Sequence, residues 1–203
     1  MKDDRFEIKC GVMIAIFASF LAIMQLGSAE SEEAMTIAYA EKTNAYGWYN
    51  AKSIKQNLVE GQRDTLTFLL ESGAITRELT GATQKNLEAL ELKAARYKAE
   101  KKEILLGSAA VGEENWTDLS DDSRGTIVGA KEWEKNAETY GAVNEVFDLS
   151  NLILQICLVI SAICLMVQST KSRAIFFTSA ILIGLVGSGI GVKAVFEFIA
   201  LSS

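Results

Sequence analysis

The chain has 203 residues, of which 49% are apolar, carries a net charge of −6 and contains no histidine. Without histidine, the Ser–His and Cys–His nucleophile pairs are excluded, together with the commonest general base and metal ligand. The acidic balance argues against nucleic acid as a partner, because basic side chains supply the electrostatic part of that binding.

The first predicted element is an apolar run at residues 10–29, which follows a short charged tail at 1–9. At ~1.5 Å rise per residue such a run measures ~30 Å, the thickness of the hydrocarbon core of a bilayer. We therefore expect a transmembrane helix. The small residues at 27–29 resemble a signal-peptidase site, but we expect this run to be retained as an anchor.

The polar region at 30–148 contains no proline and holds 22 acidic and 14 basic residues. We expect helices at 30–72, 83–106 and 120–148, joined by a loop at 107–119. Ser120 is the predicted N-cap of the third helix, with Asp121 and Asp122 in its first turn. Helices of ~65, ~36 and ~43 Å allow the first to pair with the other two placed end to end. This predicts a long antiparallel, coiled-coil-like stalk.

Apolar stripes at alternating three- and four-residue steps predict the contacts within this stalk. The first helix should face the seam with Ile37, Ala40, Asn44, Gly47, Ala51, Ile54 and Leu58. The second should present Leu87, Leu90, Ala94, Tyr97, Lys101 and Ile104, and the third Ala130, Trp133, Ala137, Tyr140 and Phe147. A single seam buries little core, so we expect self-association or docking on a larger membrane complex.

The stretch AYGWYNAKSIKQ, at 45–56, combines three aromatic residues with two lysines. Together with two aromatics of the third helix it gives the candidate interaction residues: Tyr46, Trp48, Tyr49, Lys52, Ser53, Lys55, Trp133 and Tyr140. These side chains could bracket a helix crossing within the chain, with the lysines paired to acids. They could instead form a docking surface for a second chain, because Trp and Tyr dominate interface hot spots. A small-ligand site is the third possibility.

The loop before the third helix is acidic, with Glu113, Glu114 and Asp118 followed by Asp121 and Asp122. It lacks the alternating ligands and the glycine of an EF-hand, so we expect a solvated loop and leave calcium binding open. We predict no catalytic residue, no cofactor and no metal site elsewhere in the chain. The three cysteines, Cys10, Cys157 and Cys164, lie in or beside apolar runs and are expected to be inert thiols.

Two further transmembrane helices are predicted at 149–168 and 174–193, joined by a turn at 169–173 and followed by an interfacial end at 194–203. Small residues in the last span, Gly184, Gly187, Ser188 and Gly191, predict close approach of another helix. Whether that helix belongs to the same chain or to another subunit stays open at this point. Lys193 and Glu197 are spaced to form a surface salt pair.

Basic residues near the spans predict the orientation of the chain. The tail at 1–9 carries three of them and the turn at 169–173 carries Lys171 and Arg173, so both segments should face the cytoplasm. The stalk should then lie outside, and the C-terminal end at the outer interface.

The sequence also resembles a known family. Three features show the resemblance: the motif Trp48-Tyr49-x-Ala51-Lys52-Ser53-Ile54-Lys55-Gln56 after the first span, a helix with Arg96-Tyr97-x-Ala99-Glu100-Lys101, and the closing pair of spans. The pattern resembles a bacterial three-span membrane family catalogued as domain of unknown function 4337. Asn50 stands where members usually have glutamine, and the loop around Trp116 departs from the pattern. The resemblance implies a three-span bacterial inner-membrane protein, whose stalk, on the orientation predicted above, is periplasmic; it implies no activity.

Together these features predict an all-α membrane protein that acts as a non-enzymatic scaffold. It would self-associate or serve as an accessory subunit of a larger membrane complex. The alternative is a component of a channel or transport assembly, which would need a polar route across the bilayer. The spans offer few candidates for such a route: Gln25, Asn151, Gln155, Ser161 and Lys193.

Overall fold

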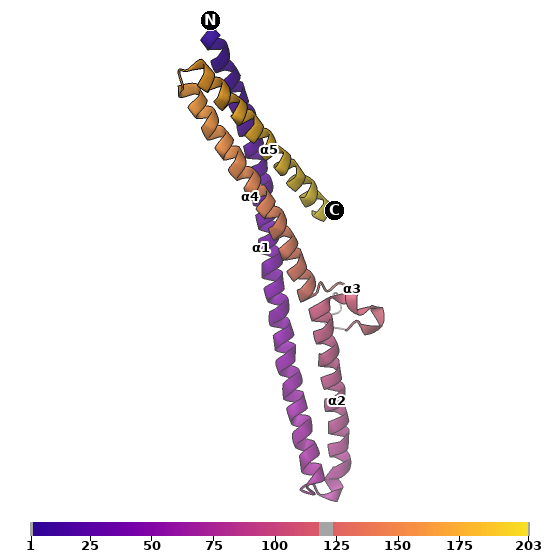
Figure 1. The fold of residues 1–203 in the computed structure, drawn as a ribbon. Coiled ribbons are helices and arrows are strands. Elements are labelled where there is room, and N and C mark those ends of the chain that lie inside the picture. The colour runs from indigo at the N-terminus through magenta and orange to yellow at the C-terminus, as the bar shows by residue number, and fades with distance from the viewer. Residues whose placement is uncertain (1, 118–123, 203) are drawn as a thin grey trace. The chain divides into compact units, whose positions relative to one another are not determined.

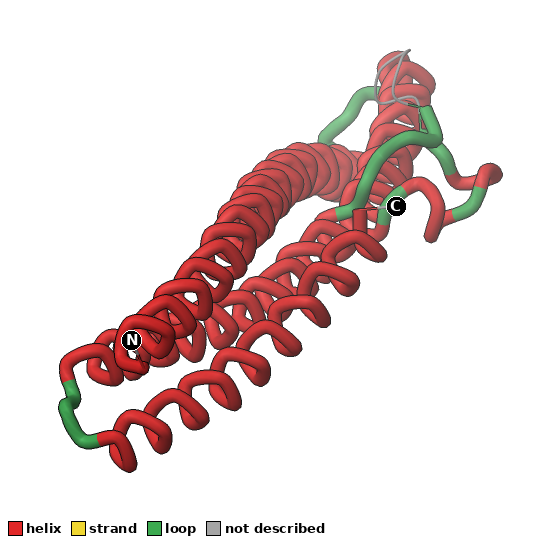
Figure 2. Tube along the Cα trace, turned by 90° about the horizontal axis from the view of Figure 1, so that it is seen from above, coloured by secondary structure: helices red, strands yellow, loops and turns green. Residues whose placement is uncertain are grey.

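The computed structural model describes residues 2–117 and 124–202, and over these residues it contains helices and no strand (Figures 1 and 2). The elements are α1 (Lys2–Glu71), α2 (Arg77–Leu106), α3 (Ser108–Val111), a 3-10 turn (Glu113–Asn115), α4 (Ala130–Met166) and α5 (Thr170–Ser202). The all-α class is therefore confirmed. The chain divides into two compact units: unit 1 comprises Met1–Thr36 and Ala137–Ser203, and unit 2 comprises Ile37–Asn136.

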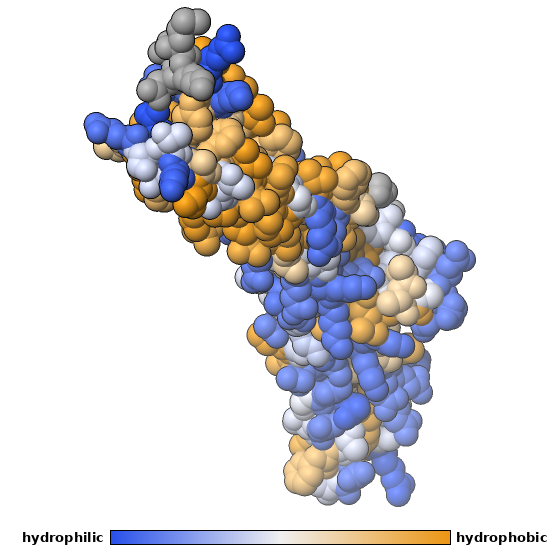
Figure 3. Space-filling view, turned by 45° about the horizontal axis from the view of Figure 1, so that its top comes forward, coloured by the Kyte–Doolittle hydropathy of each residue, from blue (hydrophilic) through white to orange (hydrophobic). Residues whose placement is uncertain are grey.

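Unit 1 contains the three apolar runs. Each of α1, α4 and α5 has a window that is long and apolar enough to cross a membrane, and the face of this unit drawn in Figure 3 is predominantly hydrophobic. The predicted runs are not separate helices, since α1 and α4 continue without interruption into the charged residues that flank them. The turn between α4 and α5 covers residues 167–169.

The core of unit 1 is built from side chains repeated every seven residues. On α1 the buried positions include Cys10, Phe17, Met24 and Ser31, and on α4 they include Phe147, Leu154 and Ser161. A seven-residue repeat keeps one face of each helix turned toward its neighbours. The rings of Phe147 and Phe198 lie 6.5 Å apart, so α5 closes this core near its end.

In unit 2, α1 ends where glycine permits a left-handed residue. Gly73 has φ of 71°, the Ala74 amide donates to the Leu69 carbonyl, and the Gly73 amide donates to the Leu70 carbonyl. This pattern is a Schellman motif, which satisfies the last carbonyls of a helix. The expected end beside Gly73 is thus correct.

The starts of α2 and α4 differ from the sequence-based expectation. α2 begins at Arg77 rather than at residue 83, because Gly81 continues the helix at a cost of only about 1 kcal/mol. α4 begins at Ala130 rather than at residue 120, because Gly125 is left-handed, with φ of 78°. The predicted cap Ser120 and the acids Asp121 and Asp122 lie outside the described residues.

Gly129 is the actual N-cap of α4. Its carbonyl accepts hydrogen bonds from the amides of Glu132 and Trp133, and its amide donates to the Glu132 carboxylate at 2.9 Å. The bond from the Gly129 amide to the Glu132 carboxylate is one half of a capping box; the half that needs an N-cap side chain is missing, because glycine has none. Glycine is required there, because a Cβ atom at 129 would overlap the backbone of Leu106 and Gly107.

The predicted seam is correct for α2 and wrong for α1. All six α2 stripe residues, from Leu87 to Ile104, are buried or half-buried. On α1, however, the expected stripe from Ile37 to Leu58 is exposed at every position. Between residues 37 and 59, the buried or half-buried residues of α1 are Ala38, Lys42, Ala45, Tyr46, Tyr49, Lys52, Ser53, Gln56 and Val59. Polar and aromatic side chains with partners on α2 and α4 therefore line this side of α1 together with a few small apolar ones.

Candidate interaction site

The centre of the α1–α2 contact is a buried carboxylate, Glu100, whose side chain is 0% exposed. Lys52 of α1 donates to one of its oxygens at 2.5 Å, and Arg96 of α2 donates to the other at 2.7 Å. Lys52 is itself only 14% exposed, whereas Arg96 is 63% exposed. A carboxylate can be buried in this way only when it is paired and hydrogen-bonded. Lys52 therefore fixes α2 against α1 at this level.

Two cation–π contacts extend this cluster along the seam. The Lys52 ammonium lies 5.6 Å from the centre of the Tyr97 ring, and the Lys101 ammonium lies 5.1 Å from the centre of the Tyr49 ring. Each contact joins one helix to the other. Both distances are within the ~6 Å over which a ring attracts a cation. The aromatic–lysine stretch thus has partners on α2.

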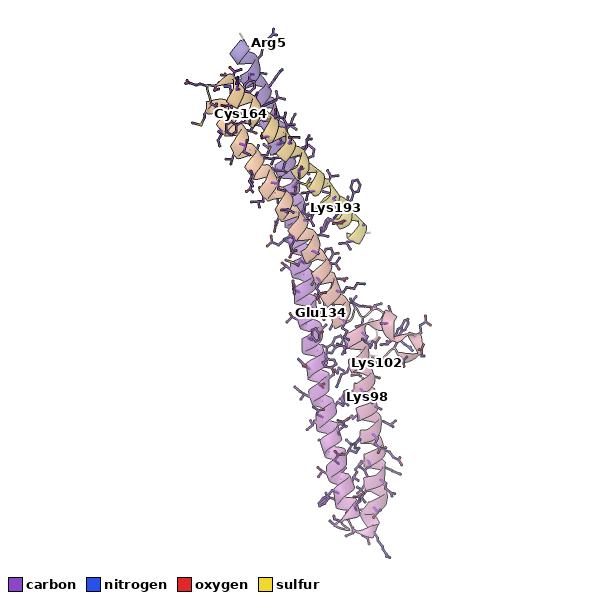
Figure 4. The ribbon with its side chains drawn as sticks, in the orientation of Figure 1. Arg5, Lys98, Lys102, Glu134, Cys164 and Lys193 are labelled. Carbon is purple, nitrogen blue, oxygen red and sulfur yellow. The ribbon has the colours of Figure 1, made fainter. Side chains whose placement is uncertain are left out.

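A second cluster, around Glu134 (labelled in Figure 4), joins α1 to the start of α4, still within unit 2. Lys42 pairs with Glu134 at 2.7 Å, and the Tyr46 hydroxyl donates to the same carboxylate at 3.3 Å. The hydrogen bond from Lys42 lowers the pKa of Glu134 and in return raises the pKa of Lys42. Partial burial, followed by the charge of Glu134, raises the pKa of Tyr46.

A third carboxylate, Glu103, is completely buried and organises the segment after α2. Its oxygens accept hydrogen bonds from the Ser108 hydroxyl at 2.7 Å, the Thr117 amide at 2.8 Å and the Thr117 hydroxyl at 2.5 Å. The indole of Trp116 donates to the Ser108 carbonyl at 2.8 Å. This part of the expected solvated loop is therefore tied to α2 by a buried polar network.

Sequence reasoning missed both buried carboxylates. Glu100 lies three residues after Tyr97 and four before Ile104, two members of the α2 stripe. An acid inside an apolar stripe is the signal that could have identified it. Glu103 gave no comparable signal, because its partners come from a segment with no periodic pattern.

The other candidate residues are distributed over three environments. Trp48 is 40% exposed and lines a cavity of about 520 Å³ together with Trp133, Glu41 and Val128. Lys55 is exposed and Ser53 is half-buried. Tyr140 belongs to unit 1, where its ring lies 6.2 Å from that of Phe198. The structure thus brings Trp48 and Trp133 together within unit 2, and Tyr140 belongs to the other unit.

The glycines of the last span pack within unit 1. Added Cβ atoms at Gly184 and Gly191 would overlap Phe17 and Met24 of α1, and one at Gly187 would lie 3.1 Å from Leu154 of α4. The Ser150 hydroxyl also donates to the Gly187 carbonyl at 2.9 Å. Gly184, Gly187 and Gly191 therefore let α5 approach both neighbours. The Ser188 hydroxyl is buried without a hydrogen-bond partner.

Other chemistry is sparse in the described part of the chain. Residues 2–117 and 124–202 contain no group of three His, Cys, Asp or Glu side chains placed to hold a metal ion. Cys10, Cys157 and Cys164 are buried free thiols, and the sulfur atoms of Cys10 and Cys164 lie 3.8 Å apart. Of the acidic loop, Glu113 and Glu114 are both exposed, and Asp118 lies outside the described residues.

Comparison with known proteins identifies the family. No curated protein and no solved structure matches the chain. The model of the family described as "Domain of unknown function (DUF4337)" matches residues 6–197, which is nearly the entire chain. The protein therefore belongs to the DUF4337 family.

Proposed function

We propose that this protein is a non-enzymatic scaffold of the bacterial inner membrane that self-associates or acts as an accessory subunit of a larger membrane complex. Its three spans lie within α1, α4 and α5, with the N-terminus and the turn at 167–169 in the cytoplasm. Unit 2 is a periplasmic, antiparallel helical stalk. The positive-inside distribution of Lys2, Arg5, Lys9, Lys171 and Arg173 supports this orientation.

The apolar windows of the three helices support insertion into a bilayer. Many large hydrophobic side chains on unit 1 are exposed, among them Val12, Ile16, Ile23, Leu182 and Leu185. Exposed apolar surface on this scale is unfavourable in water and favourable against lipid tails. The close packing of α5 on Phe17, Met24 and Leu154 fits three spans held together within one chain.

The exposed apolar stripe of α1 is the observation that carries the association proposal. In unit 2, Tyr49 and Lys52 are engaged by α2, whereas Ile37, Ile54 and Leu58 are 52%, 69% and 62% exposed. Unit 2 holds much of the charge of the chain, so water is its expected surroundings. A stripe of large apolar side chains on a water-facing helix marks a contact surface.

Native mass spectrometry of the protein extracted in mild detergent tests the proposal. We expect a species heavier than the 22.1 kDa protomer, either a multiple of that mass or the mass of a mixed complex. Proteomic identification of the co-extracted chains distinguishes these two cases. A stable, lone 22.1 kDa species would refute the proposal.

A role in a channel or transport assembly is a second candidate, and one observation favours it. The side-chain oxygen of Asn151 is buried within unit 1 without a hydrogen-bond partner, as is the Ser188 hydroxyl. Unpaired polar atoms within spans are costly and often mark a route for a polar solute. Ion flux in liposomes, compared between the parent chain and Asn151→Leu, tests this alternative.

A further inference from the structure

One side of α1 in unit 2 carries an uncharged heptad repeat, which we call the outer repeat. Its ten residues follow one another at alternating three- and four-residue steps: Ile37, Ala40, Asn44, Gly47, Ala51, Ile54, Leu58, Gly61, Thr65 and Phe68. All ten are exposed in the structure. The described residues of the chain thus leave this side of the helix uncovered over 32 residues.

A different repeat on the same helix makes the contacts within the chain. Lys42, Tyr49, Lys52 and Val59 face inward, and Tyr49 lies about half a helical turn away from the outer repeat. A helix that packs on one side only has no need of a second apolar repeat on the other. A 3.5-residue period sustained over more than four heptads is the pattern by which one helix packs along another.

We propose that the outer repeat is the seam on which a second copy of this chain docks, α1 against α1, parallel and in register. The inference rests on the proposed function, because anchoring by identical spans gives both copies the same direction in the membrane. It goes further in naming the partner, the surface and the register.

The residues of the outer repeat fit a homotypic seam. Asn44 occupies a core position, where a lone asparagine pairs with the same residue of a parallel partner and fixes the register. Gly47 and Ala51 follow it and allow the two backbones to approach closely. On the N-terminal side the next repeat position is Glu33, and on the C-terminal side the helix ends beside Gly73. The uncharged surface is therefore bounded at both ends.

The charges beside the outer repeat are compatible with in-register pairing. In a parallel pair, the residue just before the first core position of each heptad lies beside the residue five positions further along in the partner. Thr36 would then meet Glu41, Asn50 would meet Lys55, and Asp64 would meet Leu69. No like charges are brought together at these flanks.

The available area is also sufficient. Thirty-two residues at ~1.5 Å per residue give a seam of ~48 Å, which at a contact width of ~10 Å covers ~500 Å² on each copy. The total of ~1,000 Å² is at the lower bound of the area expected for a biological interface. Leu58, Gly61 and Thr65 also line a cavity of about 740 Å³ together with Leu90 of α2, so at this end the outer repeat borders the groove between α1 and α2.

Disulfide trapping of the full chain in membranes tests this seam. The variants Asn44→Cys and Leu58→Cys each place a thiol at a core position, where the α-carbons of a parallel pair lie within disulfide range. We expect both to form a covalent dimer on mild oxidation. The matched controls are the parent chain, whose three cysteines are buried, and Lys98→Cys on α2, which is exposed. Neither control should give more than a trace of dimer.

Ala51→Glu supplies a second test, because it places two carboxylates opposite each other in the seam. Since Ala51 is exposed, the helix content should be unchanged, while the yield of the Asn44→Cys dimer should fall at least tenfold. Lys102→Glu, which also changes the charge of an exposed residue, should leave the yield unaltered.

Trapping at only one of Asn44→Cys and Leu58→Cys would indicate a crossing or antiparallel contact and overturn the proposed register. If neither variant is trapped but native mass spectrometry still shows a species heavier than the protomer, the proposed seam is wrong and the scaffold proposal stands. If native mass spectrometry shows only the protomer, both the seam and the scaffold proposal are wrong.

Discussion

Replacing Lys52 by methionine should loosen α2 from α1. The substitution keeps an apolar side chain against Tyr97 and removes the cation that pairs with the buried Glu100. Removing one partner of a buried ion pair costs about 3–5 kcal/mol. Arg96 remains bound to the other carboxylate oxygen at 2.7 Å, so we expect a smaller loss of about 2–4 kcal/mol.

Native-state hydrogen exchange of the full chain measures this loss locally, because it reports the free energy of opening for each peptide. At 1.4 kcal/mol per factor of ten, amides of α2 near Glu100 should exchange about 30- to 700-fold faster in Lys52→Met. Arg96→Met, which removes a cation that is 63% exposed, should change exchange by less than about fivefold. In Lys52→Met/Glu100→Gln much of the protection should return. Equal effects of Lys52→Met and Arg96→Met would refute the assignment of Lys52 as the residue that makes burial of Glu100 possible.

Three further predictions concern other contacts. Glu103→Ala leaves the Ser108 and Thr117 donors without their acceptor, so protease cleavage between residues 107 and 117 should accelerate at least tenfold, while the exposed Glu114→Gln should have no effect. Gly184→Ala should lower the free energy of unfolding in detergent, measured by thermal denaturation, by about 1–3 kcal/mol, because the added methyl overlaps the Phe17 ring. Gly189→Ala places its methyl where no atom lies within 4 Å, so it should be neutral. Pairing with Lys42 lowers the pKa of Glu134 from its usual 4.5. The ion pair therefore stabilises unit 2 fully above pH 4.5, and this stabilisation is lost as the pH falls through the lowered pKa of Glu134. In Glu134→Gln the protection of α4 amides near residue 134 should therefore show no such loss between pH 5 and 3, and a loss identical to that of the parent would contradict the pairing.

The sequence predicted the class and the helices of this fold well, because long apolar windows and glycines are local signals. The end of α1 follows from Gly73, and the α2 stripe from Leu87 to Ile104 is continuous. Both expectations agree with the structure. The start of α4 was less accessible, since it depends on Gly129 fitting against the backbone at Leu106, a contact between segments far apart in sequence.

The composition of the α1 seam could not be predicted from periodicity. α1 carries two repeats, one of small and apolar residues and one of polar and aromatic residues, and hydrophobicity alone favoured the first as the internal seam. The structure places the second inside, because Lys52 and Tyr49 have partners of matching chemistry in Glu100 and Lys101. Of the candidate interaction residues, Trp48 and Lys55 remain exposed.

Labelling of single cysteines in intact cells tests the central claim, a helical unit held outside the cytoplasmic membrane by three spans. A membrane-impermeant maleimide should modify Lys98→Cys and Lys102→Cys, on α2, without permeabilisation. Lys171→Cys, in the first turn of α5, should react only after the membrane is opened. The parent chain should stay unmodified because its cysteines are buried. Labelling of Lys171→Cys in intact cells, with Lys98→Cys protected, would contradict the proposed architecture.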